Sequence, residues 1–230
     1  MEIRVINATL INLLEFDQIP FTKLLVGSNL KNIQEHFAFK NIEVRQKPDG
    51  QSAIVLQGGL YNQDTIVKRV EVGERKITIE VEEKSAIAKK VFDSLKELLR
   101  ELSKTDDETY LSPVVQTVES IIIAKMNFHA TSLIHPQFNK FINSTVESAT
   151  SDEQKQAITS IFGISFRIDY FAQGEFARKL KDSLVTLSRK DFTIGPRDGT
   201  ALDEKIFISK APLDTEVHIT LLEEIETIFT

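Results

Sequence analysis

The chain of 230 residues contains no cysteine, which excludes disulfide bonds and metal sites built on thiolates. Only four histidines occur, and they are scattered, so we expect no metal ion and no cofactor. The sequence also lacks a Gly-x-Ser-x-Gly motif, a phosphate-binding glycine-rich loop and a dinucleotide fingerprint. No motif therefore specifies a reaction, and we expect the protein to be non-catalytic.

Long apolar runs are missing as well. The densest run, residues 120–124, is far shorter than the ~20 residues that a membrane-spanning helix needs. The amino terminus shows no basic stretch followed by an apolar core and a cleavage site, so it does not resemble a secretory signal. We expect a cytoplasmic protein that does not contact a membrane.

Disorder is not expected, because glycine and proline are few, with nine and six residues, and no long low-complexity tract occurs. Apolar residues make up 41% of the chain and include fifteen phenylalanines, which is enough for a continuous core. The net charge is −6, and the excess of acidic residues lies in the second half of the chain. An acidic domain repels a nucleic-acid backbone, so nucleic acid is an unlikely partner.

The order of strand-like and helix-like segments appears twice. A β-branched run at 8–17 leads through Pro20 into a helical pattern, and a similar run at 119–128 leads through Pro136 into another. Both halves end with an apolar strand followed by a helix, 86–102 in the first half and 215–229 in the second. This repeated order of strands and helices predicts an internal duplication. Few residues are identical between the halves, so the alternative is a chance similarity of strand-then-helix units.

The predicted fold is α+β, an antiparallel curved sheet with helices on one face. It consists of two pseudo-repeated halves, residues 1–104 and 114–230, joined by a polar linker at 105–113 within one continuous domain. Each half is expected to contain a strand, a helix, three to four strands and a final helix. This order of elements is similar to one half of the saddle-shaped TATA-binding-protein architecture. The likeness is one of topology alone, and topology does not fix function.

Alternating polar and apolar residues predict a hairpin of strands 65–72 and 76–81, with its turn at Gly73 and Glu74. Gly58 and Gly59 predict a β-bulge. The segment 175–188 fits the spacing of a helix, but its place in the repeated order favours a strand, and we predict a strand.

Basic residues cluster on the predicted hairpins of the two halves and form the candidate binding site. The set consists of Lys68, Arg69, Arg75, Lys76, Arg178, Lys179 and Lys181. Such a patch binds phosphate groups or an acidic partner protein. The alternative is that charged residues on hairpins discourage edge-to-edge aggregation.

One pattern resembles the Pro-Asp and Glu-x-Lys elements of restriction-endonuclease-like nucleases: Pro48-Asp49, followed by Glu82-Glu83-Lys84 at the end of an apolar strand. The resemblance implies that Asp49 and Glu82 hold a divalent cation and that Lys84 assists the attacking water or the phosphate. The alternative is an ordinary Pro-Asp-Gly turn and a solvated strand end.

Near the carboxyl-terminal end of the last predicted helix stand Glu223, Glu224 and Glu226, where the helix dipole favours cations. Their placement is explained either by a basic partner surface or by simple solvation.

We therefore expect a soluble module that binds another protein or forms a homodimer through the exposed face or edge of its sheet. The alternative is the metal-dependent nuclease of Asp49, Glu82 and Lys84. A third possibility is a carrier of an apolar small molecule, which requires a cavity of roughly 300 Å³ or more between sheet and helices.

Overall fold

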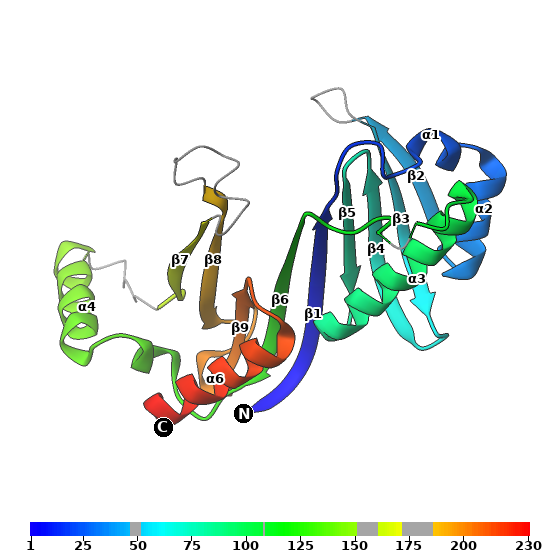
Figure 1. Cartoon of the computed structure of the whole chain (residues 1–230). Helices are drawn as coiled ribbons and strands as arrows, with labels where there is room; N and C mark the ends of the chain where they lie inside the picture. The colour runs from blue at the N-terminus through cyan, green and yellow to red at the C-terminus, as the bar shows by residue number, and fades with distance from the viewer. Residues whose placement is uncertain (47–51, 108, 151–160, 172–185) are drawn as a thin grey trace. The chain divides into compact units, whose positions relative to one another are not determined.

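The computed structural model describes residues 1–46, 52–107, 109–150, 161–171 and 186–230. Its strands are β1 (Glu2–Leu13), β2 (Asn41–Gln46), β3 (Ser52–Tyr61), β4 (Thr65–Gly73), β5 (Lys76–Val81), β6 (Val115–Lys125), β7 (Ile164–Phe171), β8 (Thr186–Pro196) and β9 (Ile206–Ala211). They form an open, nine-stranded antiparallel sheet in the order β2-β3-β4-β5-β1-β6-β9-β8-β7 (Figure 1). The predicted α+β class with an antiparallel sheet is confirmed.

The described helices are α1 (Phe21–Leu24), α2 (Gly27–His36), α3 (Ser85–Ser103), α4 (Pro136–Thr150) and α6 (Thr215–Phe229). Short 3-10 turns occur at η1 (Ala130–Leu133) and η2 (Leu202–Glu204). No helix in the described ranges is both long and apolar enough to cross a membrane.

The chain forms two compact units. The α3 unit consists of residues 6–120 and 213–217, and the α6 unit consists of residues 1–5, 121–212 and 218–230. Strands β1 and β6 contribute residues to both units. The duplication, the linker at 105–113 and the boundary between two halves stay predictions.

The hairpin of β4 and β5 follows from the alternation in its sequence. Ile77, Ile79 and Val81 are buried, whereas Thr78 and Glu80 between them are partly exposed. Val72 lies opposite Ile77, and the register shifts between Val67 and Arg69, where β4 has an irregularity. Burial of every second side chain is what a sheet with one packed side requires.

Helix α3 buries one stripe against this hairpin in the α3 unit (Figure 1). The predicted helix 86–102 is confirmed, and its stripe residues are buried or partly buried at Ile87, Val91, Leu95, Leu98 and Leu102. Each large side chain that is fully buried contributes roughly 1.5–3 kcal/mol to folding. One buried cluster joins this stripe to Leu24 of α1, to Ile33 of α2 and to Phe37, which follows α2.

Gly58 and Gly59, predicted to form a bulge, pair with β4 without a register shift and instead mark a close approach between two segments. Gly58 has φ +66°, a conformation that favours glycine. A Cβ on Gly59 would lie 2.5 Å from the ring of Phe39, so only glycine lets that ring lie against β3. Phe39 is 3% exposed and belongs to the buried cluster.

In the α6 unit, β8 pairs with β7 on one side and with β9 on the other. The ring of Phe128 lies 4.9 Å from that of Phe207 in β9 and 5.4 Å from that of Phe229 in α6, measured between centroids. These contacts connect α6 to the sheet of its own unit. Most of the segment predicted as a strand at 175–188 lies outside the described residues, which resume at Thr186 in β8.

Candidate functional site

The basic residues predicted on the first hairpin are bound largely by groups of the chain itself. Lys68 Nζ lies 2.8 Å from Asn7 Oδ1 and 3.3 Å from a carboxylate oxygen of Glu82. Arg69 donates from Nη2 to the carboxylate of Glu71, within the same strand. The positive charges of Lys68 and Arg69 are thus each balanced by a nearby carboxylate.

Arg75 and Lys76 lie at the turn end of the same hairpin. Arg75 donates from Nε to the carbonyl of Leu14 at 3.3 Å, and its guanidinium lies 3.8 Å from the centroid of the Phe16 ring. Lys76 is exposed and lies opposite Leu13 of β1. Arg178, Lys179 and Lys181 lie outside the described residues, so a shared basic surface stays a prediction.

Four charges on β2 and β4 form one neutral group. Val55 of β3 lies between the two glutamates, since it pairs with Glu43 of β2 on one side and with Glu71 of β4 on the other. Arg45 Nη2 is 2.6 Å from the Glu43 carboxylate, and this hydrogen-bonded contact lowers the pKa of Glu43 and raises the pKa of Arg45. With the pair of Arg69 and Glu71, two positive charges meet two negative ones, so this surface does not attract polyanions.

The residues of the nuclease hypothesis have separate partners. The Glu82 carboxylate is 3.3 Å from Lys68 Nζ, whereas Lys84 Nζ is 2.7 Å from a carboxylate oxygen of Glu216, whose hydrogen bond raises the pKa of Lys84. Asp49 lies outside the described residues. Within the part of the chain that is described, no group of three or more His, Asp or Glu side chains is placed to hold a metal ion.

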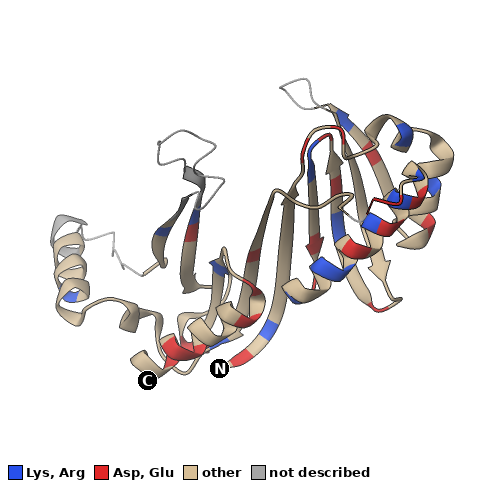
Figure 2. Cartoon of the chain, viewed as in Figure 1, with Lys and Arg blue, Asp and Glu red and all other residues tan. Residues whose placement is uncertain are grey.

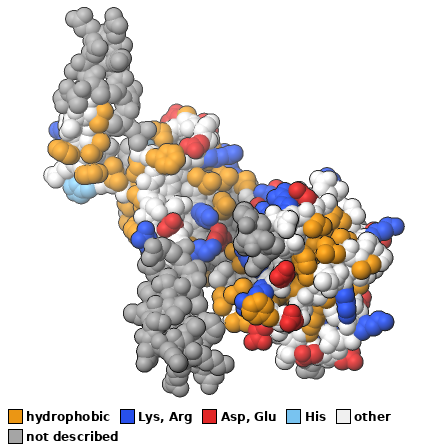
Figure 3. Space-filling view, turned by 90° about the horizontal axis from the view of Figure 1, so that it is seen from above, with side chains coloured by type: hydrophobic (Ala, Val, Ile, Leu, Met, Phe, Trp, Pro, Cys, Tyr) orange, Lys and Arg blue, Asp and Glu red, His pale blue; other side chains and the backbone are white. Residues whose placement is uncertain are grey.

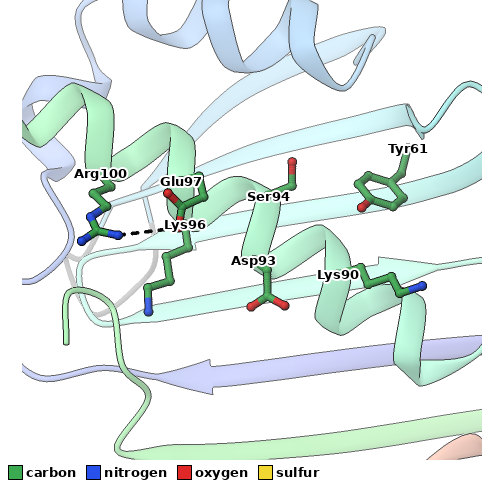
Figure 4. A pocket seen from close by; sticks show the side chains of 7 residues that line it. All are labelled: Tyr61, Lys90, Asp93, Ser94, Lys96, Glu97 and Arg100. Carbon is green, nitrogen blue, oxygen red and sulfur yellow. Dashed lines mark ion pairs between the residues drawn. The ribbon is translucent and has the colours of Figure 1, made fainter. Parts of the chain in front are cut away.

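A shallow depression of about 520 Å³ lies beside α3 in the α3 unit (Figure 4). Tyr61 comes from the end of β3, and the other lining residues come from α3: Lys90, Asp93, Ser94, Lys96, Glu97 and Arg100. Their polar ends point in different directions along the helix, and the only ion pair drawn joins Arg100 to Glu97 at 4.0 Å. Side chains that diverge in this way do not form a reaction centre.

A second depression, of about 510 Å³, shares Tyr61 and Ser94 with the first. His36, the last residue of α2, has its Nε2 2.9 Å from Ser94 Oγ, a distance that resembles a base beside a nucleophile. Among the described residues, no carboxylate accepts a hydrogen bond from the other ring nitrogen of His36. The pair is also exposed, so it lacks both the orienting group and the exclusion of water that serine-histidine catalysis uses.

An apolar depression of about 290 Å³ lies in the α6 unit, where β7, β8 and β9 contribute its lining. Gly163 and Gly195 pass close together, since a Cβ on Gly195 would lie 2.8 Å from the Gly163 Cα. Phe162 is 81% exposed at its rim. The depression opens on the strands rather than between sheet and helices, where the carrier hypothesis expects a cavity.

None of the site residues predicted from the sequence lies in β2. At its centre an apolar residue, Val44, stands between Glu43 and Arg45, and the strand forms one edge of the described sheet. The signal was the pair of opposite charges two residues apart, which an alternating strand directs to the same side. That signal becomes informative only once the strand is known to be an edge.

Comparison of the chain with models of protein families and with curated proteins found no match.

Proposed function

We propose that this protein is a non-catalytic binding module that engages another protein, or a second copy of itself, through the uncovered side and the edge of its sheet. The observation that supports the proposal is the alternation of buried and partly exposed side chains along β1 and β5 of the α3 unit. Alternate side chains of β1 and β5, such as Leu10 and Ile79, join one buried cluster with side chains from α1, α2 and α3. The intervening side chains, among them Ile11 and Thr78, remain partly exposed.

The chemistry of this second side suits a protein partner. It combines apolar and hydroxyl side chains, with Ile11 opposite Thr78 in register, and Leu13 is 38% exposed. Its arginines at 45 and 69 are each paired with a glutamate. Figure 2 shows acidic and basic residues interspersed over the strands and helices of this unit. Figure 3, which views the chain from above, shows hydrophobic side chains between charged ones at the end of this unit rather than on this side of its sheet. Interfaces between proteins have this mixed composition.

Nucleic acid fits this side less well. A phosphate backbone is bound by basic side chains that carry unneutralised charge, and the net charge of the chain is −6. The nuclease remains the alternative function and the apolar carrier the third, but neither has an observation in the described residues that favours it over protein binding.

The predicted duplication is part of the proposal. Reading outward from β1, the strand order is β5, β4, β3 and β2, and reading outward from β6 it is β9, β8 and β7. The first residues of α3 and α6, Ser85 and Thr215, accept hydrogen bonds from each other's backbone N–H. Two related halves meeting at equivalent helix starts would produce both features.

Site-specific photo-crosslinking in cells tests the proposed surface. A benzophenone amino acid at Thr78 of the full chain should give discrete adducts with one protein, or adducts of twice the chain mass. The matched control is the same group at Asp93, an exposed position of α3 on the packed side of the sheet. Equal adducts from both positions, or none from Thr78, would contradict the proposal.

A further inference from the structure

Strand β2 has the properties of an edge that accepts another strand. Among the described strands it is hydrogen-bonded only to β3, and its side chains are exposed except for the partly buried Ile42. Val44 is 52% exposed, although alternation places it on the same side of the sheet as Ile42. An edge strand offers unpaired backbone N–H and C=O groups along its length.

The charges of β2 are arranged symmetrically about Val44. Glu43 and Arg45 lie on the same side of the strand, and their side chains are 54% and 46% exposed. The nearest charges from the neighbouring strands, Arg69 and Glu71, are paired with each other and add no net charge. Along β2, a negative residue (Glu43), an apolar residue (Val44) and a positive residue (Arg45) therefore follow one another.

We propose that β2 pairs in antiparallel fashion with β2 of a second copy of this chain, with Val44 opposite Val44 of the partner subunit. This inference rests on the proposed function, and it names the partner and the contact. In this register Glu43 lies opposite the partner subunit's Arg45, and Arg45 lies opposite the partner subunit's Glu43. A twofold axis through Val44 makes the contact self-complementary, as a symmetric dimer requires.

Other registers of the same two strands are unfavourable. A shift by two residues in either direction places glutamate against glutamate or arginine against arginine. A shift by one residue places Val44 opposite a charged side chain and turns the packed sides of the two sheets to opposite faces. Parallel pairing in register opposes like charges at both positions. The charge order thus selects one arrangement and disfavours the rest.

A strand from a different protein would complement these charges only if it carried the same alternation, whereas a second copy carries it by construction. Because only residues 42–46 of each strand lie opposite one another in this register, the contact is small, and we expect a weak dimer. Longer contacts would be needed for a permanent assembly.

Charge exchange tests the proposal by sedimentation velocity on the full chain at concentrations up to about 1 mM. Glu43→Arg creates a strand with two positive charges, and Arg45→Glu creates one with two negative charges. Each variant alone should dimerise at least about tenfold more weakly than the natural chain. An equimolar mixture of the two should recover the dimer, and so should the double variant Glu43→Arg/Arg45→Glu. Circular dichroism and thermal unfolding check that these exposed substitutions leave the fold intact.

The outcomes separate this inference from the function on which it rests. A natural chain that remains monomeric throughout overturns the β2 contact, while a Thr78 adduct with another protein would leave the binding module standing. A dimer that both single variants retain also overturns the contact, because self-association would then use a different surface. Loss in the single variants without recovery in the mixture overturns it as well.

Discussion

Ser85 and Thr215, 130 positions apart, cap each other at the starts of two helices. Ser85 N–H donates to Thr215 Oγ1 at 2.9 Å, and Thr215 N–H donates to Ser85 Oγ at 3.1 Å. Both residues are buried, so neither backbone group can turn to water instead. Ser85 Oγ in turn donates to the Asp214 carboxylate at 2.9 Å, and the same carboxylate accepts a hydrogen bond from Lys89 Nζ at 2.8 Å. These bonds explain how α3 begins without a side-chain cap from the residue before it.

Replacing Thr215 with valine should lower the free energy of unfolding by about 1–2 kcal/mol, since the buried N–H of Ser85 then lacks an acceptor. Urea denaturation of the full chain measures the change. The matched control is Thr227→Val, because the Thr227 hydroxyl is exposed and donates to the Glu223 carbonyl of its own helix. We expect that control to stay within about 0.5 kcal/mol of the natural chain. Equal effects at both positions would show that the reciprocal cap contributes nothing specific.

His218 should make the protein less stable in mild acid. It is 0% exposed, and burial lowers its pKa from 6.5 to about 4. Ser209 Oγ donates to the Thr193 carbonyl, so His218 Nε2 is the donor in its 2.8 Å contact with Ser209. Because burial disfavours the charged ring, the folded protein favours the neutral imidazole. The resulting stabilisation is present above pH 6.5 and is lost as the pH falls toward 4, by roughly 3 kcal/mol in total.

Denaturation across pH 6.5 to 4 tests this dependence, with His218→Gln as the variant. Glutamine can still donate to Ser209 but does not titrate, so its stability should change less over this range. His129→Gln, at an exposed position, should show the same dependence of the free energy of unfolding on pH as the natural chain. If His218→Gln and the natural chain lose stability in parallel, the buried histidine does not cause the acid sensitivity.

Local patterns in the sequence were sufficient to predict most elements of the α3 unit. The alternation at Ile77, Ile79 and Val81 identified β5, and the helical spacing from Ile87 to Leu102 identified α3 within one residue at each end. Both signals depend on which side of one element is buried, and neighbouring residues carry that information.

Features that depend on distant partners were not predictable in this way. The sequence suggested that Lys68 belongs to a free basic patch, but Asn7 and Glu82 approach it only after β1, β4 and β5 come together. Glu226 appeared unfavourable at the end of a helix, yet its carboxylate accepts hydrogen bonds from the amino terminus of Met1 at 2.6 Å and from Asn127 N–H at 2.8 Å. The partner of each of these charged side chains lies on a different strand or at a distant position in the chain. A short stretch of sequence does not reveal which strands become neighbours, so it does not reveal these partners.

Gly59→Ala should destabilise the protein by about 1–3 kcal/mol through overpacking, because the added methyl would lie 2.5 Å from the Phe39 ring and 2.8 Å from the Phe37 carbonyl oxygen. Thermal and urea unfolding measure the effect. Gly27→Ala is the matched control, since nothing lies within 4 Å of its added methyl at the start of α2. That control should be neutral or stabilising by up to about 1 kcal/mol. A neutral Gly59→Ala would mean that the Phe39 ring moves aside at no cost.

Divalent cations should leave the protein unchanged if the nuclease hypothesis fails. The Glu82 carboxylate is balanced by Lys68, and Lys84 is bound by Glu216, so a cation would have to displace two ion pairs to use both residues. Addition of Mg²⁺ or Mn²⁺ to the full chain should therefore not raise the unfolding temperature, and cleavage of DNA or RNA should be absent. A cation bound by the folded state at a hundred times its dissociation constant would stabilise it by about 2.7 kcal/mol, which thermal unfolding readily detects. A rise that disappears in both Asp49→Ala and Glu82→Ala, together with metal-dependent cleavage lost in the same variants, would instead establish the nuclease.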